Sequence, residues 1–206
     1  MISIRFYEPA DAPRLVEAAR ESTLEVFPWM SWCHPAYSLE ESEAWITAQI
    51  EARKARSAFE FAVYEGERFL GGCGLNQIDT EHRTANLGYW VRTSAAGCGV
   101  APAAVRLLST WGFANTALQR LEIVAAVGNT RSQRVAEKSG ARREGIFPSR
   151  LYLHDRAHDA VVYSFVRSDF VGRISARTTD RRADRRPRNP PSSGRVAPNG
   201  GLRPSV

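Results

Sequence analysis

The segment from residue 94 to residue 101, Ser-Ala-Ala-Gly-Cys-Gly-Val-Ala, has the composition of a loop that holds a phosphate group. Its side chains are small, and glycines stand at positions 97 and 99. Residues 87–91 before it alternate in polarity as strands do, and residues 100–113 after it carry an apolar stripe with helical spacing. A loop between a strand and a helix directs backbone N–H groups and the positive end of the helix dipole at one place, which suits a phosphate or pyrophosphate. A tight turn without any ligand has the same composition.

Other chemistries have weaker support in the sequence. No Gly-Lys-Ser/Thr follows the loop as a P-loop requires, and no third glycine stands at the offset of the dinucleotide-binding fingerprint. Cys33, Cys73 and Cys98 lack metal-ligand spacing and fit a reducing cytoplasm. Cys98 has no His or Asp beside it that would activate a nucleophile, so we interpret it as a filling residue. The sequence therefore predicts no metal site.

The remaining elements predict one domain around this loop. Ser38 and Glu41 form a capping box at the start of one helix, Asp11 is the expected N-cap of another, and Gly140 ends a third. The strand–helix–strand order through residues 87–127 implies one parallel strand pair with a right-handed crossover. The predicted fold is α+β, a mixed and mostly antiparallel central sheet flanked by helices. Predicted strands cover residues 2–6, 58–64, 69–78, 84–91, 121–127, 141–147 and 159–167, and predicted helices cover residues 11–22, 38–56, 100–113 and 132–140.

The basic charge of the chain is concentrated at its end. The formal net charge is +6, and residues 171–206 hold nine arginines against two aspartates, so residues 1–170 are nearly neutral. Residues 171–206 are rich in Arg, Pro and Gly and poor in large apolar side chains, which predicts a disordered tail. Its arginine run either contacts RNA or the ribosome weakly or stays solvated without a partner. Residues 1–170 are the predicted domain, without a membrane span or signal peptide, and a cytoplasmic location is expected.

Several motifs in order resemble the GCN5-related N-acetyltransferases. Residues 96–101 are similar to the family's Gln/Arg-x-x-Gly-x-Gly/Ala loop: Gly99 and Ala101 match, whereas Ala96 stands where the family has a polar or bulky residue. Residues 129–132, 135–145 and 155–159 resemble segments of the RimJ/RimL-like branch, the ribosomal-protein N-terminal acetyltransferases. The resemblance extends over about residues 2–170 and leaves the tail outside.

This resemblance implies transfer of an acetyl group from acetyl-CoA to a primary amine by direct attack in a ternary complex. A backbone N–H near residues 90–92 would polarise the acetyl carbonyl, and Asn129 would bond the pantetheine arm. Ser132 would hydrogen-bond the leaving thiolate, because residues 132–140 contain no tyrosine. The implied residues for acetyl-CoA are Trp90, Val91, Arg92, Gly97, Cys98, Gly99, Val100, Ala101, Asn129 and Ser132.

Glu122 is the predicted catalytic base, and Ser132 is the other predicted catalytic residue. Glu122 is in phase with Val124 and Ala126 on the predicted strand, and a carboxylate acting with a water can accept the proton of the amine. The alternative is a solvent-facing glutamate, with bulk water as the base. Leu151 stands near the place where relatives carry a second carboxylate.

The expected acceptor pocket draws on the aromatic segment of residues 23–37, namely Trp29, Trp32, His34 and Tyr37. The same side chains would otherwise pack as a small core beneath the loop. The favoured function is N-acetylation of a protein N-terminus or a small amine by a monomer or homodimer. Two alternatives are an acyl-CoA-binding module without turnover and a ribosome- or RNA-associated protein that acts through residues 171–206.

Overall fold

The computed structural model describes residues 1–170, and the predicted disordered tail lies outside the described residues. The order of elements agrees with the prediction from sequence, and short 3₁₀ turns at Pro9–Asp11 and Thr93–Ala95 are added to it. No helix within residues 1–170 is long and apolar enough to cross a membrane. The strands are β1 (Ile2–Phe6), β2 (Phe59–Glu65), β3 (Arg68–Asp79), β4 (Thr84–Val91), β5 (Arg120–Ala126), β6 (Arg142–Leu153) and β7 (Arg156–Val166), and the helices are α1 (Ala12–Val26), α2 (Leu39–Lys54), α3 (Val100–Asn115) and α4 (Thr130–Ser139).

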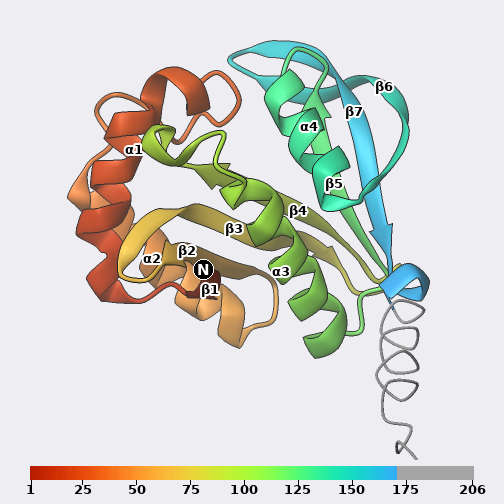
Figure 1. The fold of residues 1–206 in the computed structure, drawn as a ribbon, viewed down its shortest axis with the longest axis horizontal. Helices are drawn as coiled ribbons and strands as arrows, with labels where there is room; N and C mark the ends of the chain where they lie inside the picture. Colours follow the sequence, from red (N-terminus) through yellow and green to blue (C-terminus); the bar gives the residue numbers. More distant parts are fainter. Residues whose placement is uncertain (171–206) are drawn as a thin grey trace, which may run out of the picture. The chain divides into compact units, whose positions relative to one another are not determined.

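The strands form one mixed sheet in the order β1-β2-β3-β4-β5-β7-β6 (Figure 1). Only β4 and β5 are parallel, as the strand–helix–strand order predicts. Their pairing joins Thr84–Asn86 to Arg120–Glu122 and then stops, so residues 87–91 of β4 have no strand partner on that side. The sheet therefore divides at the carboxyl ends of its two central strands, where α3 and α4 begin.

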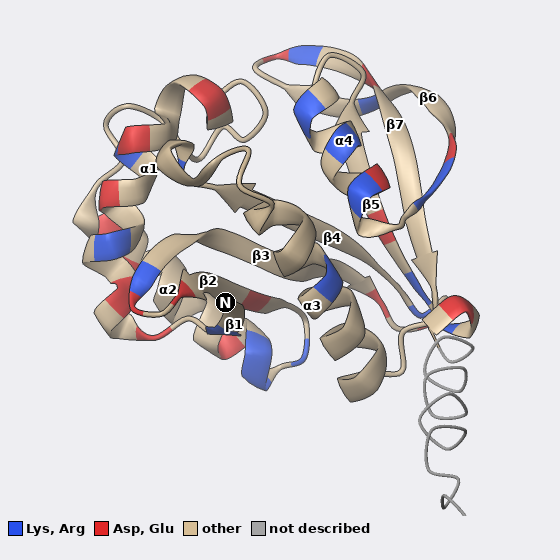
Figure 2. Cartoon of the chain, viewed as in Figure 1, with Lys and Arg blue, Asp and Glu red and all other residues tan. Residues whose placement is uncertain are grey.

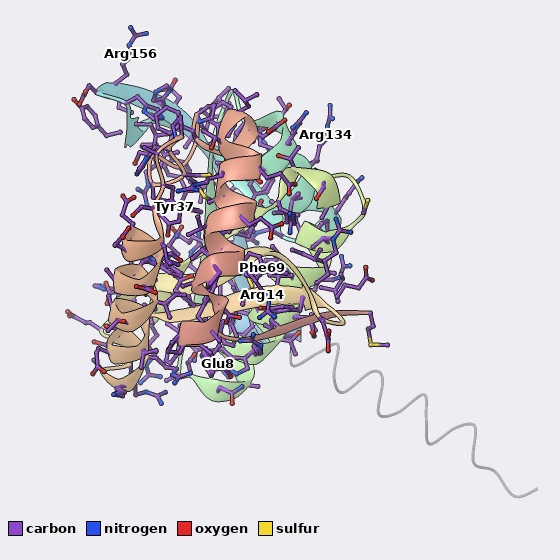
Figure 3. The ribbon with its side chains drawn as sticks, turned by 90° about the vertical axis from the view of Figure 1, so that its left-hand side faces the viewer. Glu8, Arg14, Tyr37, Phe69, Arg134 and Arg156 are labelled. Carbon is purple, nitrogen blue, oxygen red and sulfur yellow. The ribbon has the colours of Figure 1, made fainter. Side chains whose placement is uncertain are left out.

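Helices cover both faces of the sheet. The core beneath α3 contains Leu75, Leu87 and Leu121 from three neighbouring strands, all almost fully buried. The opposite face packs against α1 and α2, where Leu15 and Ile46 are the largest fully buried side chains. Figure 3 shows α1 running across this second face with α2 beside it. The hydrophobic burial that stabilises the domain thus lies on both sides of β2–β4.

The predicted helix caps have different outcomes. The Ser38–Glu41 capping box is present, with the Glu41 N–H 3.2 Å from Ser38 Oγ and the Ser38 N–H 2.8 Å from Glu41 Oε2. Gly140 ends α4 in the left-handed conformation as predicted, with φ of 88°. Asp11 is the N-cap residue of α1 as predicted, but its side chain makes no capping hydrogen bond to that helix, because its carboxylate instead binds Arg5 and Tyr64. Partners outside α1 thus take the place of the capping hydrogen bond at this position.

The last two strands are longer than predicted. β6 continues past Pro148 to Leu153, and β7 begins at Arg156. The register between them shifts from Phe147 to Leu151, so a bulge accommodates the proline and lets pairing resume beyond it. A proline therefore marked a bulge in an edge strand rather than the end of one.

Gly71 should tolerate no side chain. It lies beside a bulge of β3 with φ of +145°, and an added Cβ would stand 2.3 Å from the carbonyl oxygen of Trp90 and 2.8 Å from Cα of Val91. We expect Gly71→Ala to lower the free energy of unfolding by about 2–3 kcal/mol, because the clash is with backbone that cannot rotate away. Gly66→Ala is the control, since Gly66 also has positive φ but no atom within 4 Å. Equal losses in urea unfolding of the two variants would contradict this account.

Candidate active site

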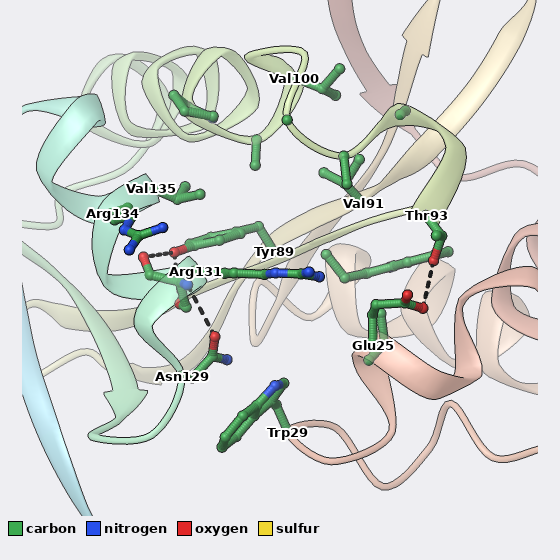
Figure 4. A pocket seen from close by; sticks show the side chains of 18 of the residues that line it. Glu25, Trp29, Tyr89, Val91, Thr93, Val100, Asn129, Arg131, Arg134 and Val135 are labelled. Carbon is green, nitrogen blue, oxygen red and sulfur yellow. Dashed lines mark hydrogen bonds between the residues drawn. The ribbon is translucent and has the colours of Figure 1, made fainter.

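A pocket of about 680 Å³, here called the first pocket, opens where β4 and β5 separate. Three segments line it: the end of α1 with the following loop, the end of β4 with the loop to α3, and one side of α4 with Asn129 before it (Figure 4). The loop of residues 95–101 contributes mainly backbone, because its side chains are absent or small. The glycine-containing loop predicted from sequence to hold a phosphate thus forms one wall of the pocket.

The geometry of this loop fits an anion. Gly97 and Gly99 both have φ of +78°, and a Cβ added to either would meet nothing within 4 Å. These glycines are therefore required by backbone conformation rather than by space. Gly99 is the N-cap of α3 and offers no capping side chain, so the first N–H groups of the helix are left for a ligand. The first turn of α3 contains no acidic residue that would compete with an anion.

Basic side chains from α4 line the opposite wall. Arg131, Arg134 and Lys138 follow one another at spacings of three and four residues, which places them along one side of the helix. All three are exposed, and Figure 2 shows basic residues along α4. None forms a salt bridge with another residue of the described part of the chain. The first pocket therefore combines helix N–H groups with cations, as recognition of several phosphates requires.

Ser132 and Asn129 lie at the inner end of the same wall. Asn129 Oδ1 accepts a hydrogen bond from the Ser132 N–H at 3.0 Å and so caps α4. Ser132 Oγ lies 2.9 Å from the hydroxyl of Tyr89, a residue of β4. Burial raises the pKa of the Tyr89 hydroxyl well above its usual range, so Tyr89 remains a hydrogen-bond donor at all physiological pH values. The sequence predicts no tyrosine near Ser132, yet the fold supplies one from another element.

A second pocket, of about 410 Å³, adjoins the first pocket. Met30, Tyr89 and Trp90 line both pockets. Of the predicted acceptor residues, Trp32, His34 and Tyr37 line the second pocket, whereas Trp29 lines the first. The Trp29 ring lies 3.3 Å from the position that a Cβ on Gly128 would take, so it bridges the α1 loop to the turn before α4. The structure thus separates Trp29 from the other three.

Three further residues of the predicted site do not line either pocket. Glu122 Oε1 accepts from Arg120 Nε at 2.8 Å, and Arg120 also binds Glu144. The backbone N–H of Arg92 bonds to the Leu70 carbonyl at 2.9 Å, and its guanidinium binds carboxylates on α1. Cys98 is exposed at the tip of the loop.

A divided mixed sheet with an anion-binding loop at the division defines a class of proteins, the acetyl-CoA-dependent N-acetyltransferases. The model of the acetyltransferase (GNAT) domain matches residues 2–142. The putative ribosomal N-acetyltransferase YdaF of Bacillus subtilis is 31% identical over 172 residues, which cover 83% of this chain and 94% of that protein. This chain therefore belongs to the acetyltransferase (GNAT) domain family.

Solved structures agree with this assignment. The structure of a putative ribosomal-protein-serine acetyltransferase from Vibrio cholerae has a TM-score of 0.70 and 28% sequence identity, covering 80% of this chain and 93% of that chain. RimJ of Mycobacterium smegmatis, solved in complex with CoA-disulfide, has a TM-score of 0.76 at 20% identity, covering 82% of this chain and 83% of that chain. At this level of identity, the similarity to RimJ shows a shared fold only.

Sequence reasoning missed several residues of both pockets. Arg131 and Arg134 stand in or beside the Asn-Thr-Arg-Ser motif, so their basic charge was a visible signal of an anion site. Glu60 is the only charged residue in the run Phe59–Val63 and was also conspicuous. Tyr7 and Tyr89 carry no comparable signal, because each stands in a segment that is aromatic and apolar for reasons of packing.

Proposed function

We propose that this N-acetyltransferase acetylates the α-amino group of a protein or peptide chain in the cytoplasm, as a monomer or homodimer. The observation that carries the proposal is the junction of the two pockets at Tyr89 and Trp90. One pocket fits the phosphates and pantetheine of acetyl-CoA, and the other is a narrow aromatic pocket that fits the end of a chain. Relatives named as ribosomal N-acetyltransferases support the same class of acceptor.

The proposed roles for acetyl-CoA follow from the first pocket. N–H groups at residues 97–101, with Arg131 and Arg134, bind the phosphates. The Arg92 N–H bonds to β3, and successive N–H groups of a strand point to opposite sides, so the Val91 N–H points to the side from which β5 has separated. The Val91 N–H is therefore the proposed donor to the acetyl carbonyl. Asn129 lies beside the pantetheine arm, with its side-chain amide nitrogen left for that contact.

Ser132 and Tyr89 together form the proposed donor to the leaving thiolate. Tyr89 Oη lies 2.9 Å from both the hydroxyl and the carbonyl oxygen of Ser132, so one hydroxyl proton holds the pair together and the other points into the pocket. The amine attacks the acetyl carbon, the C–S bond breaks, and the thiolate receives a hydrogen bond from this pair. Glu122 as the base remains a prediction to be tested beside them.

The test is acetyl-CoA consumption, measured as free thiol, with peptides of free and blocked N-terminus, polyamines and aminoglycosides as acceptors. We expect turnover on peptides with a free N-terminus. Ser132→Ala should lower kcat about tenfold, because it removes one hydrogen bond to a charged group. Glu122→Gln would lose a comparable factor or more if Glu122 is the base, and an unchanged rate would leave the proton to another group. Acetyl-CoA that binds, shown by a raised Tm, without turnover on any amine would support a binding module instead.

A further inference from the structure

The second pocket contains a carboxylate that no basic residue neutralises. Glu60, on β2, is half-buried and lines this pocket, and within residues 1–170 it makes no salt bridge. Asn76 Nδ2 donates to Glu60 Oε1 at 3.1 Å, and Asn76 Oδ1 accepts from Asn86 Nδ2 at 2.9 Å. The second bond fixes which way the Asn76 amide points. Oε2 of Glu60 has no hydrogen bond from any described residue, so it is available to a ligand.

Alternate glycines of β3 make room for this carboxylate. A Cβ on Gly74 would stand 1.8 Å from Glu60 Oε2 and 2.0 Å from its Cδ, so the carboxylate lies directly over the bare backbone. A Cβ on Gly72 would stand 2.4 Å from the Tyr7 hydroxyl and 2.9 Å from Trp90 Nε1. Neither glycine has positive φ, so each is required by space. Glycine inside a strand often marks a close approach by another group, and here the groups that approach are polar.

Tyr7 supplies the second polar group. Its side chain is 3% exposed, and among residues 1–170 its hydroxyl is the one buried side-chain polar atom without a hydrogen-bond partner. An unpaired buried hydroxyl destabilises the folded protein, and a bound hydrogen-bonding ligand would remove that cost. The hydroxyl stands beside Gly72 on the wall of the second pocket, two residues along β3 from the glycine beneath Glu60.

Aromatic rings enclose these two groups. Trp32 and Trp90 meet edge to face at a centroid distance of 5.2 Å, and Trp45 meets Tyr7 at 5.0 Å. Rings of this kind attract a cation through their faces and exclude water. A site with a carboxylate outside any salt bridge, one unpaired hydroxyl and aromatic walls has the chemistry of an ammonium-binding site.

We propose that Glu60 binds the ammonium group of the acceptor and removes its proton, with Tyr7 as a second hydrogen-bond partner. This inference rests on the proposed acetyl transfer. The N–H bond breaks and an O–H bond forms at Glu60 Oε2. The neutral amine then attacks the acetyl carbon, the C–S bond breaks, and the second amine proton leaves with the thiolate as the CoA thiol. Glu60 returns its proton to solvent before the next cycle.

Glu60 is a separate candidate from Glu122, whose role as the base stays a prediction to be tested. Glu60 is on β2 and Glu122 is on β5, three strand positions away in the sheet. At about 4.8 Å per strand their backbones are roughly 14 Å apart, far beyond a shared hydrogen bond. Glu122 is also held by Arg120, whereas the Glu60 carboxylate opens into the pocket that adjoins the acetyl-CoA site.

The titration of Glu60 suits this role. Burial raises its pKa to about 7, and the hydrogen bond from Asn76 only partly opposes the shift. The other titratable groups at this pocket are Tyr7, Tyr37, Cys73, Tyr89 and the His34–Glu41 pair, in which His34 Nε2 lies 3.0 Å from Glu41 Oε1. The pKa of an α-amino group, about 7.7–8.0, is about one unit above that of Glu60. The pKa of a lysine, about 10.4, is about three units above it. Proton removal thus favours an α-amine over lysine by about two orders of magnitude.

The experiment is the pH dependence of kcat/KM for an N-terminal peptide at saturating acetyl-CoA, in wild type, Glu60→Gln and the control Glu43→Gln. Glu43 is an exposed glutamate of α2 outside both pockets. We expect Glu60→Gln to lose about 10²-fold at pH 7 and to recover towards wild type near pH 9, where the amine is neutral without help. Wild type should lose activity as pH falls through about 7, because Glu60 becomes protonated.

Calorimetric binding of acetyl-CoA, unchanged in Glu60→Gln, shows that the variant is folded. If wild type is active and Glu60→Gln has the same rate and pH profile as wild type, the role of Glu60 is overturned and the proposed function stands. A wild type without turnover on any amine would remove both. Tyr7→Phe is the second variant: we expect KM for the peptide to rise several-fold while stability is unchanged or higher, since the hydroxyl it removes is unpaired. A loss of stability with unchanged KM would make Tyr7 merely structural.

Discussion

Replacing Arg131 and Arg134 together by alanine will weaken acetyl-CoA binding by about two orders of magnitude. Both side chains line the first pocket and, in the described part of the chain, neither has an acidic partner. Each would make a charge-assisted hydrogen bond to a phosphate. Since both are exposed, we count about 1.4 kcal/mol for each, a factor of ten in Kd. Isothermal titration calorimetry measures the change directly.

Two controls separate phosphate recognition from a general loss of positive charge. Arg156→Ala removes an exposed arginine at the tip of the β6–β7 hairpin, outside both pockets, and should leave Kd unchanged (Figure 3). S-acetyl pantetheine lacks the nucleotide phosphates, so its kcat/KM should be the same for wild type and the double variant. Raising salt should weaken acetyl-CoA binding more steeply in wild type. Equal Kd in wild type and the double variant would show that the phosphates lie elsewhere.

Replacing Asp11 by alanine will lower the free energy of unfolding by about 3 kcal/mol. The Asp11 side chain is fully buried and accepts hydrogen bonds from Arg5 at 2.6 and 2.7 Å, from the Tyr64 hydroxyl at 2.6 Å and from the Glu8 N–H at 3.0 Å. Removing it takes away the acceptor of four hydrogen bonds from three residues. Breaking a buried pair costs about 3–5 kcal/mol, and the lower end applies because Arg5 is 40% exposed and can be hydrated.

The dependence on pH gives this prediction a second readout. Burial acts to raise the pKa of Asp11, but the hydrogen bonds from Arg5, Tyr64 and the Glu8 N–H outweigh it, so the pKa lies below its usual value. Because the pKa is lower in the folded state, the stabilisation is complete above the unfolded pKa of about 3.9 and is lost as pH falls below it. Urea unfolding should show the difference between wild type and variant shrinking below about pH 4.

Glu51→Ala is the control for this measurement. Glu51 pairs with Lys54 at 2.7 Å on the surface of α2, and both side chains are 65% exposed. A solvated ion pair of this kind contributes about 0.5 kcal/mol or less. If Asp11→Ala costs no more than Glu51→Ala, the buried network does not stabilise the domain.

The sequence by itself determined the order of the elements, the parallel pair and the anion-binding loop. These depend on local signals: alternation in β2–β5, the Ser38–Glu41 box, the glycines at 97, 99 and 140, and the strand–helix–strand order. Each is encoded within a few residues or by order along the chain, because backbone hydrogen bonding and capping are local. Local signals placed Asp11 at the start of α1 but did not give the partners of its carboxylate, which stand 6 and 53 residues away.

Only the tertiary structure decided which side chains share a pocket. The register of β2, β3 and β4 brings Glu60, Asn76 and Asn86 into one hydrogen-bonded row. The packing of α4 against its neighbours brings Ser132 to Tyr89 of β4. The same packing directs Trp29 to one pocket and Trp32 to the other. Sheet register and helix packing arise from burial across the whole domain, so no spacing along the chain records them.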